Sequence, residues 1–376
     1  MWFEQIQALQ TSEDGEFGPE NFRDRQPNHF VLSIENQHPL LFRNRTFVMF
    51  SSLVTFILYV AAQLSNHTPT RTNYSQPAQP LTGPGGQEYL HDDVVMFDFA
   101  SQPEGYWLFE PAKPQPAAAP VVVFIHGYGG YNPMIYGAWI RHLVRKGNIV
   151  IYPRYQKNML SPSPEHFAEN VSIAIKDALA ELKKPGHITA LDSGLVFVGH
   201  SYGGVVAADL AVNHEQYEVP KPEAMFLCAP GSGSFKGGRL DDYSGMPADI
   251  KLLMVVNEND WVVGDELAVK LFEETKHLKH RNLLRQVGDD YGSPAIEAHH
   301  NQTYALDTVF DSGARNYTSK RALKIGRTDA VDYYCYWKLC DALLDFTRTG
   351  ENEHIAFGGT PEQLYMGRWS DGTPVR

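Results

Sequence analysis

From residue 121 onward the chain repeats one pattern: a short apolar run, then glycines and polar residues, then a longer amphipathic stretch. The apolar runs have the length and composition of strands that are buried on both faces. They occupy residues 121–125, 195–198, 224–228, 251–256 and 282–287. Stretches around residues 136–146, 164–184 and 264–275 predict helices. Strands that alternate with helices predict an α/β fold, with a mostly parallel central sheet and helices on both faces.

The rest of the chain suggests five segments. Residues 1–46 are polar and without clear periodicity, so we assign them no role. Residues 47–64 form the most apolar window, and residues 65–90 are rich in Pro, Thr, Gln and Gly, as expected for a linker. We expect the catalytic domain over residues 91–350, beginning with a β-hairpin at the sheet edge, and a C-terminal tail over residues 351–376.

Three interpretations of residues 47–64 remain open. An uncleaved signal anchor is the first, because Arg43 and Arg45 precede the apolar window. A cleaved signal peptide is the second, with its start nearer Met49 and a small-residue cleavage site at residues 60–62. A buried helix of the fold is the third. The first two predict an extracytoplasmic domain, which is either attached to a membrane or released.

Composition and charge exclude several classes of function. The net charge of −12 argues against a nucleic-acid partner. Of the three cysteines, Cys228 ends an apolar run and is expected to be a small buried side chain. Cys335 and Cys340 fall on one predicted helix, where they point about 140° apart and do not favour a disulfide. His277 and His280 have no Cys or acidic partner at metal-ligand spacing, so we expect neither a metal nor an organic cofactor.

The segment Gly199-His200-Ser201-Tyr202-Gly203 carries the strongest chemical signal. An apolar run enters it and a run of small residues leaves it, which predicts a strand, a sharp turn and then a helix. Glycines on both sides of Ser201 suit a strained turn that leaves no room for Cβ atoms. This context predicts a nucleophile elbow with Ser201 as the nucleophile.

The other parts of a serine hydrolase follow in the expected order, with the acid and then the base after the serine. The apolar run 251–256 opens into a polar loop in which Asp260 is the candidate acid. Further on, His299 and His300 are the candidate bases, and the residues alone leave the choice between them open. Upstream, the loop that begins at His126 follows a strand and can aim a backbone N–H group at a developing oxyanion.

From about residue 121 to residue 300 the chain resembles the α/β-hydrolase superfamily, in the branch of small serine esterases that includes dienelactone-hydrolase-like and cutinase-like enzymes. Four motifs carry the resemblance, and they begin at His126, Gly199, Glu258 and Ala298. The resemblance implies that the backbone N–H groups of Tyr128 and Tyr202 form the oxyanion hole. It also selects His300 as the base, because relatives carry the histidine in an Ala-x-His pattern.

These observations predict a metal-independent serine hydrolase that cleaves carboxylic esters through Ser201, His300 and Asp260, with an acyl-enzyme intermediate. We expect its substrate to be a small-molecule or lipid-like ester. An acyltransferase or a serine peptidase with the same triad is an alternative. A catalytically silent, membrane-tethered binding module is another, although all three triad residue types follow suitable strands.

Access to the site depends on two segments. Residues 231–249, where members of this fold often carry a cap, form a short Gly-rich connection and predict an open site. Residues 303–328 are the segment able to cover it. Tyr131 and Trp261, together with the rings of the two oxyanion-hole tyrosines, are candidates to hold an apolar acyl group, and packing in the core is the alternative for each.

Overall fold

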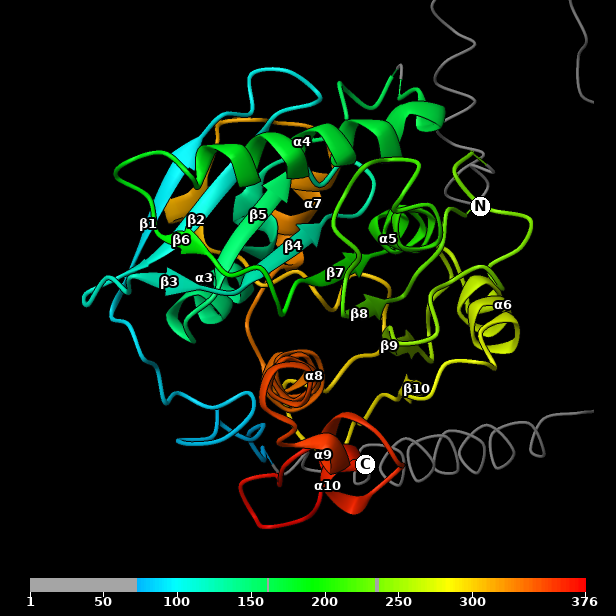
Figure 1. The fold of residues 1–376 in the computed structure, drawn as a ribbon. Coiled ribbons are helices and arrows are strands. Elements are labelled where there is room, and N and C mark those ends of the chain that lie inside the picture. The colour runs from blue at the N-terminus through cyan, green and yellow to red at the C-terminus, as the bar shows by residue number, and fades with distance from the viewer. Residues whose placement is uncertain (1–72, 161, 234–236) are drawn as a thin grey trace, which may run out of the picture. The chain divides into compact units, whose positions relative to one another are not determined.

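The computed structural model describes residues 73–160, 162–233 and 237–376 (Figure 1). All of them belong to the second of the two units into which the chain divides, Arg71–Arg376. The predicted segments at residues 1–46 and 47–64 lie outside the described residues. Among the residues that are described, no helix combines the length and the apolar character needed to cross a bilayer.

A twisted sheet of eight strands forms the centre of the domain. In spatial order its strands are β1 (Asp93–Asp98), β2 (Tyr106–Ala112), β5 (Ile149–Pro153), β4 (Val121–Ile125), β7 (Val196–His200), β8 (Ala224–Cys228), β9 (Lys251–Asn257) and β10 (Arg281–Gln286). Strand β2 is antiparallel to both of its neighbours, and all other pairs are parallel. The predicted α/β fold is confirmed, including the hairpin at the sheet edge.

Helices cover both faces of this sheet. They are α3 (Gly137–Arg145), α4 (Phe167–Glu181), α5 (Tyr202–Val212), α6 (Glu266–Glu274), α7 (Tyr317–Ile325), α8 (Trp337–Thr349), α9 (Glu353–Ala356) and α10 (Pro361–Leu364). Short 3₁₀ turns occupy Pro133–Tyr136, Pro164–His166 and Thr308–Phe310, and a π-helical turn, Asp332–Tyr336, leads into α8. A small parallel pair, β3 (Ala118–Ala119) and β6 (Thr189–Ala190), lies beside the main sheet.

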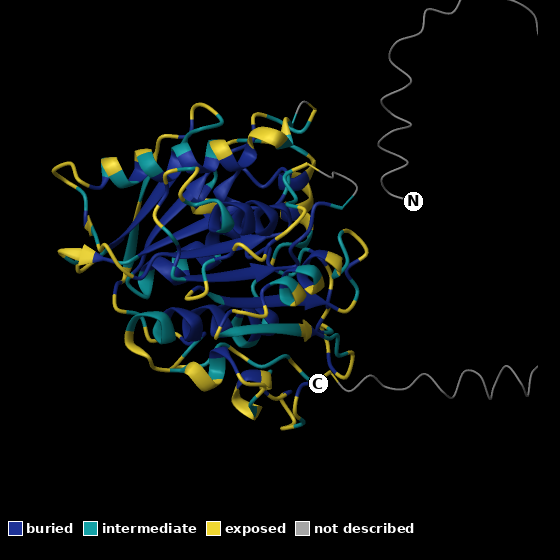
Figure 2. Cartoon of the chain, turned by 45° about the vertical axis from the view of Figure 1, so that its right-hand side comes forward, coloured by how far each residue is buried: buried dark blue, intermediate teal, exposed yellow. Residues whose placement is uncertain are grey.

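Alternation along the strands divides the core into two layers. In β4, Val122 and Phe124 face the layer formed with α3 and α8, whereas Val121, Val123 and Ile125 face the layer formed with α4, α5 and α6. The central strands are buried, the edge strands β1 and β10 are partly exposed, and the helices expose their outer faces (Figure 2). Because each buried aliphatic side chain contributes about 1.5–3 kcal/mol, the two layers hold the strand ends rigidly in place.

The predicted cysteine environment agrees with this core. Cys228 is buried at the end of β8, and Cys335 and Cys340 are buried in the π turn and in α8. All three are free thiols. The helix predicted around Cys335 and Cys340 is therefore present, with a π turn at its start.

The two flanking segments pack on the domain. Residues 73–90, the described part of the predicted linker, contain no helix or strand, yet the Gly85 amide donates to Asp341 at 2.8 Å. In the predicted tail, Trp369 is fully buried. The Lys338 ammonium is buried and donates to three backbone carbonyls in residues 362–365, which fastens α10 to α8.

Candidate active site

Ser201 lies at a strained turn between β7 and α5. Its backbone has φ 56° and ψ −122°, a conformation that costs a residue with a Cβ atom on the order of 1–3 kcal/mol. Backbone hydrogen bonds hold the turn: the Ser201 amide donates to the Cys228 carbonyl at 2.9 Å, and the Ser201 carbonyl accepts from Gly204 and Gly231. The predicted strand, turn and helix around the serine are all present.

The glycines of this turn are required by close backbone contacts. A Cβ atom on Gly203 would lie 2.0 Å from the Ile125 carbonyl oxygen, and one on Gly199 would lie 2.8 Å from the Gly203 carbonyl oxygen. A side chain at either position would push α5 away from the ends of β4 and β7. The Gly-x-Ser-x-Gly pattern therefore has a steric cause here.

Ser201, His300 and Asp260 form one hydrogen-bonded chain. The Ser201 Oγ lies 2.9 Å from His300 Nε2, and His300 Nδ1 lies 2.7 Å from Asp260 Oδ2. A carboxylate can only accept, so Nδ1 carries a hydrogen and Nε2 accepts the serine O–H. These are the atoms that a serine nucleophile and its general base require.

The Asp260 carboxylate is buried but remains ionised. Burial by itself raises the pKa of this group, but the hydrogen bond and charge of His300 outweigh it, together with two backbone N–H donors. Those donors, Val262 and Val263, both bind Oδ1, at 2.9 and 3.0 Å. The net result is a pKa below the ordinary value, which leaves Oδ2 as a charged acceptor for His300.

The histidine doublet is separated by a β-bridge. Asn259 pairs with His299, and the Asn257 side chain donates to the His299 carbonyl at 2.8 Å. His299 consequently points to solvent, with its ring 3.4 Å from the Asn259 carbonyl, while His300 turns inward to Ser201. Of the two candidates, the structure brings only His300 to the serine.

The loop after β4 lies against the serine. A Cβ atom on Gly127 would come within 3.1 Å of the Ser201 Cβ, so the adjoining Tyr128 amide is close to the nucleophile. The loop is held by a hydrogen bond from the Gly129 amide to Gln156 at 2.6 Å and by one from Gly130 to Gly127 at 2.8 Å. Tyr202, the other predicted oxyanion-hole residue, opens α5 directly after Ser201.

The four aromatic candidates lie in different environments. The Tyr202 ring is 1% exposed, and its hydroxyl donates to the Gly237 carbonyl, so this side chain is part of the core. Tyr128 is half-buried and donates to the Met159 carbonyl at 2.8 Å. Trp261, next to Asp260, is 87% exposed. Tyr131 is 8% exposed and lines a pocket.

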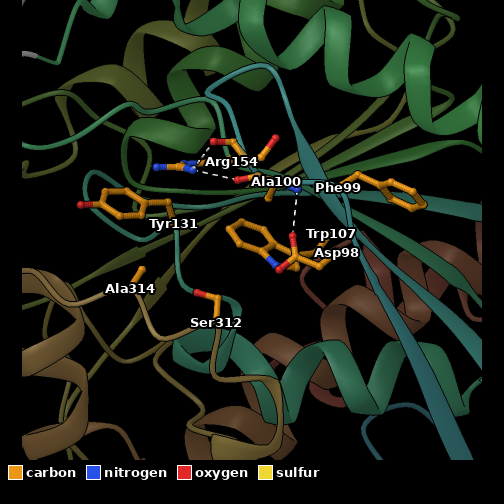
Figure 3. A pocket seen from close by; sticks show the side chains of 9 residues that line it. Asp98, Phe99, Ala100, Trp107, Tyr131, Arg154, Ser312 and Ala314 are labelled. Carbon is orange, nitrogen blue, oxygen red and sulfur yellow. Dashed lines mark hydrogen bonds between the residues drawn. The ribbon is translucent and has the colours of Figure 1, made fainter.

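This pocket has a volume of about 580 Å³ (Figure 3). Phe99, Trp107, Tyr131 and Arg154 are among its lining residues. Tyr131 and Arg154 follow the carboxyl ends of β4 and β5, as Ser201 follows that of β7. The Arg154 guanidinium donates to the Ala100 carbonyl at 2.8 Å, which holds the β1–β2 turn at the pocket wall. Ser312 and Ala314, from the segment 303–328, also line the pocket. Of the lining residues only Tyr131 was a predicted substrate-binding residue, because the pocket is assembled from segments that are far apart in the chain.

Residues 303–328 contact the loop next to the serine. The Asn316 side chain donates to the Gly129 carbonyl at 2.8 Å, and Thr318 donates to the Tyr128 carbonyl at 3.1 Å. Helix α7 begins at this point. The described residues of the other segment, 231–233 and 237–249, contain no helix or strand.

Two functional candidates were missed in the sequence. His200 lies inside the elbow motif at a position that the motif leaves free, and Tyr136 lies in a 3₁₀ turn. The Tyr136 hydroxyl and His200 Nδ1 form a hydrogen bond of 2.8 Å beside the triad. No sequence pattern predicts this contact, because 64 residues separate them. The described residues contain no group of three His, Cys, Asp or Glu suited to hold a metal ion.

The sheet order and the strand–turn–helix around Ser201 are those of the α/β-hydrolase fold, as the motifs predicted. A model of the Chlorophyllase family, a family of α/β-hydrolase-like serine esterases, matches residues 93–241, which is less than half of the chain. The matched span includes Ser201 and the loop after β4, and it ends before Asp260 and His300. No curated protein gives a significant match. Fold and family match together support an ester-hydrolysing enzyme.

Proposed function

We propose that this protein is a serine hydrolase that cleaves carboxylic esters through Ser201, His300 and Asp260. The observation that carries the proposal is the hydrogen-bonded chain from the Ser201 hydroxyl to the Asp260 carboxylate at a strained strand-to-helix turn. A structural serine has no need for such a turn or for a histidine that is hydrogen-bonded to a buried, ionised aspartate.

In the first half of the reaction, the Ser201 Oγ attacks the ester carbonyl carbon while His300 Nε2 takes the hydroxyl proton. Asp260 stabilises the resulting imidazolium through the 2.7 Å hydrogen bond and stays ionised. The oxyanion accepts from the Tyr128 and Tyr202 amides, and loss of one such donor typically costs about 100- to 1000-fold in rate. Collapse of the intermediate breaks the bond to the alcohol oxygen, which receives the proton from His300, and leaves an acyl-enzyme.

In the second half, water replaces the serine hydroxyl. His300 removes a proton from the water as it attacks the acyl carbon, and then returns that proton to the Ser201 oxygen as the acid product leaves. The cycle uses three side chains and two backbone amides of this chain, with water as the second reactant, and needs no cofactor. Both halves use the same three residues, so removal of any one of them disables the whole cycle.

For the substrate, we propose a small-molecule or lipid-like ester whose apolar part contacts Tyr131 and Trp261. Support comes from the ring-lined pocket at Tyr131, which lies over strands β1, β2 and β5, and from the exposed indole beside Asp260. Neighbouring strands are about 4.8 Å apart, so β5 lies about 10 Å along the sheet from β7. To reach this pocket from Ser201, the apolar substituent of the ester must therefore be several bonds long.

The proposal is tested with p-nitrophenyl esters of increasing chain length, with and without a covalent serine inhibitor. The name of the matched family is a reason to include chlorophyll in the panel. Wild-type protein should hydrolyse the esters and lose activity after labelling at Ser201. Ser201→Ala should lower kcat by about 10⁴-fold or more. The matched control is Ser172→Ala, a buried serine in α4, which should keep wild-type kcat. Ester hydrolysis by a folded Ser201→Ala protein would overturn the proposal.

We also propose that the domain acts outside the cytoplasm, either attached to a membrane through residues 47–64 or released by cleavage. Support comes from Arg43 and Arg45 before the apolar window. Cell fractionation with N-terminal sequencing of the product tests this. Full-length protein recovered from the cytoplasm would contradict it.

A further inference from the structure

A second set of hydrogen bonds runs behind the triad and joins two parts of the site. The Gly127 amide donates to the Tyr136 hydroxyl at 3.1 Å, and this hydroxyl lies 2.8 Å from His200 Nδ1. On the other side of the ring, His200 Nε2 lies 2.9 Å from the main-chain carbonyl oxygen of His300. Tyr136 and His200 are almost completely buried.

Each group in this set has a single possible role. The His300 carbonyl can only accept, so His200 Nε2 carries a hydrogen. Burial lowers the pKa of His200 to about 3, so the ring is neutral and Nδ1 is an acceptor. Tyr136 must then donate its hydrogen to Nδ1, and its oxygen accepts from the Gly127 amide. The direction of all three hydrogen bonds is thereby determined.

These hydrogen bonds run from Gly127 at one end to the His300 carbonyl at the other, and both ends belong to parts of the site that must be aligned with Ser201. Gly127 precedes Tyr128, whose amide we place in the oxyanion hole, and His300 is the proposed base. His200 is the last residue of β7, so one rigid strand end holds both Ser201 and the His300 backbone. The neighbouring His299 carbonyl is held in the same way by Asn257, the last residue of β9.

We propose that Tyr136 and His200 are positioning residues, which hold the Gly127–Tyr128 loop and the His300 backbone in register around Ser201. This inference rests on the proposed function. Its physical basis is the narrow tolerance of such sites, in which a displacement of about 1 Å costs about 100-fold in rate. The two side chains act through other groups and do not touch the substrate.

Tyr136→Phe tests the first link. It keeps the ring in the core but leaves the Gly127 amide without its acceptor and His200 without its donor. We expect kcat to fall about 10- to 100-fold with KM within about 3-fold of wild type, because alignment is lost while the binding surface is unchanged. The matched control is Tyr243→Phe. Tyr243 is also fully buried, and its hydroxyl accepts a backbone amide, that of Leu240, at 3.1 Å, so the change should lower stability alone.

The second link is tested by a pair of substitutions at His200. In His200→Gln the amide nitrogen takes the place of Nε2 and still donates to the His300 carbonyl. In His200→Asn the shorter side chain replaces Nδ1 only, so this carbonyl loses its donor. We expect the glutamine variant to retain kcat within about 5-fold of wild type and the asparagine variant to lose about 10- to 100-fold.

The outcomes separate this inference from the proposed function. If Ser201→Ala is inactive while Tyr136→Phe and His200→Asn keep wild-type kcat, the positioning role is wrong and the triad stands. The positioning role would also be wrong if kcat fell equally in Tyr136→Phe and Tyr243→Phe, or equally in the two His200 variants. A general loss of stability would then explain the fall in kcat. If Ser201→Ala keeps its activity, the proposed function itself fails.

Discussion

The part of the chain that the structure describes contains two buried His–Asp pairs with similar distances and very different surroundings. His300 lies 2.7 Å from Asp260, and His142 lies 2.9 Å from Asp341. Each imidazole also contacts a hydroxyl group through its other nitrogen: His300 meets Ser201 at 2.9 Å, and His142 meets Tyr89 at 3.1 Å. By distance alone, both are hydroxyl–His–Asp triads.

Their surroundings assign them different roles. Ser201 lies at a strained turn beside the amides of the loop after β4, where a substrate carbonyl can be received. Tyr89 belongs to a coil segment, and burial raises the pKa of its hydroxyl. Asp341 additionally accepts the Gly85 amide, and the His142 ring stacks on Trp337. We interpret this second triad as a clasp that fastens the segment before β1 to α3 and α8.

The comparison shows that a His–Asp pair acquires its role from the third group and from the nearby backbone donors. A buried, hydrogen-bonded His–Asp pair is compatible with a structural role or with catalysis. A serine at a strained turn, with backbone N–H groups nearby, is the additional feature that the proposed catalytic role requires. Substitutions at matching positions of the two triads test this directly.

The largest difference is expected at the two histidines. His300→Ala should lower kcat by about 10⁴-fold or more and leave the fold intact, because it removes the proposed base, which is hydrogen-bonded to Ser201. His142→Ala should keep kcat within about 2-fold and lower the melting temperature by several degrees, on the scale of about 2–4 °C per kcal/mol. Steady-state kinetics and thermal melts on both variants measure this. His299→Ala serves as the neighbouring control, and greater damage there than in His300→Ala would identify His299 as the base.

A smaller difference is expected at the carboxylates. Asp260→Asn removes the charge that orients and stabilises His300, and we expect a loss of about 10²- to 10⁴-fold in kcat. Asp341→Asn changes the same atoms in the clasp and should affect the melting temperature alone. A fall in kcat of similar size in both variants would show that the two pairs are not functionally distinct.

Acid should destabilise the region around Ser201 through its buried neutral histidines. Burial lowers the pKa of His126 to about 4 and that of His200 to about 3, against an unfolded value of about 6.5. The unfolded chain therefore binds more protons than the native protein between these values. The contribution of these two neutral histidines to the free energy of unfolding is fully present above about pH 6.5. It is lost as the pH falls toward about 4 for His126 and about 3 for His200, by up to about 1.4 kcal/mol per pH unit for each group. Denaturant unfolding of wild type and His200→Gln at pH 7 and pH 5 should show a smaller loss in the variant, and identical losses would contradict the assignment.

The smallest effect is expected at Tyr89. Tyr89→Phe removes the hydroxyl from the clasp but keeps the ring, over which the Arg145 guanidinium lies at 3.9 Å. We expect a loss of about 1 kcal/mol in the free energy of unfolding, the usual net value of one hydrogen bond, with no change in kcat. Chemical denaturation measures the loss. A fall in kcat would mean that the clasp and the site are coupled.

Much of the fold and part of the site could be predicted because their signals are local. The strand Val121–Ile125 was predicted with its observed bounds, since five consecutive apolar residues suit a strand buried on both faces. The elbow was predicted because the apolar strand before Ser201 and the small residues after it are local signals, and Gly199 is required by its contact with Gly203 in the same turn. The reason for a glycine at 203, its contact with the Ile125 carbonyl, appears only in the tertiary structure. Asp260, which the structure places against His300, was proposed as the acid because it follows a recognisable strand.

Other features of the site leave no local mark. Nothing in the residues around His299 and His300 indicates which ring turns inward, and the bridge between Asn259 and His299 decides it. The four aromatic candidates are all large aromatic side chains, so their residue types do not indicate which are buried. In the structure Tyr202 is packed in the core and Trp261 is exposed.

The sequence by itself therefore determined the class of fold, the chain order of the proposed nucleophile, acid and base, and the position of the elbow. These depend on hydrophobic period and on steric limits that act over a few residues. The tertiary structure decided which histidine meets the serine, which aromatic rings line the pocket, and how Tyr136 and His200 connect the loop after β4 to His300. Such choices depend on contacts between residues far apart in the chain, where the orientation of each side chain is set by the packing of whole strands and helices.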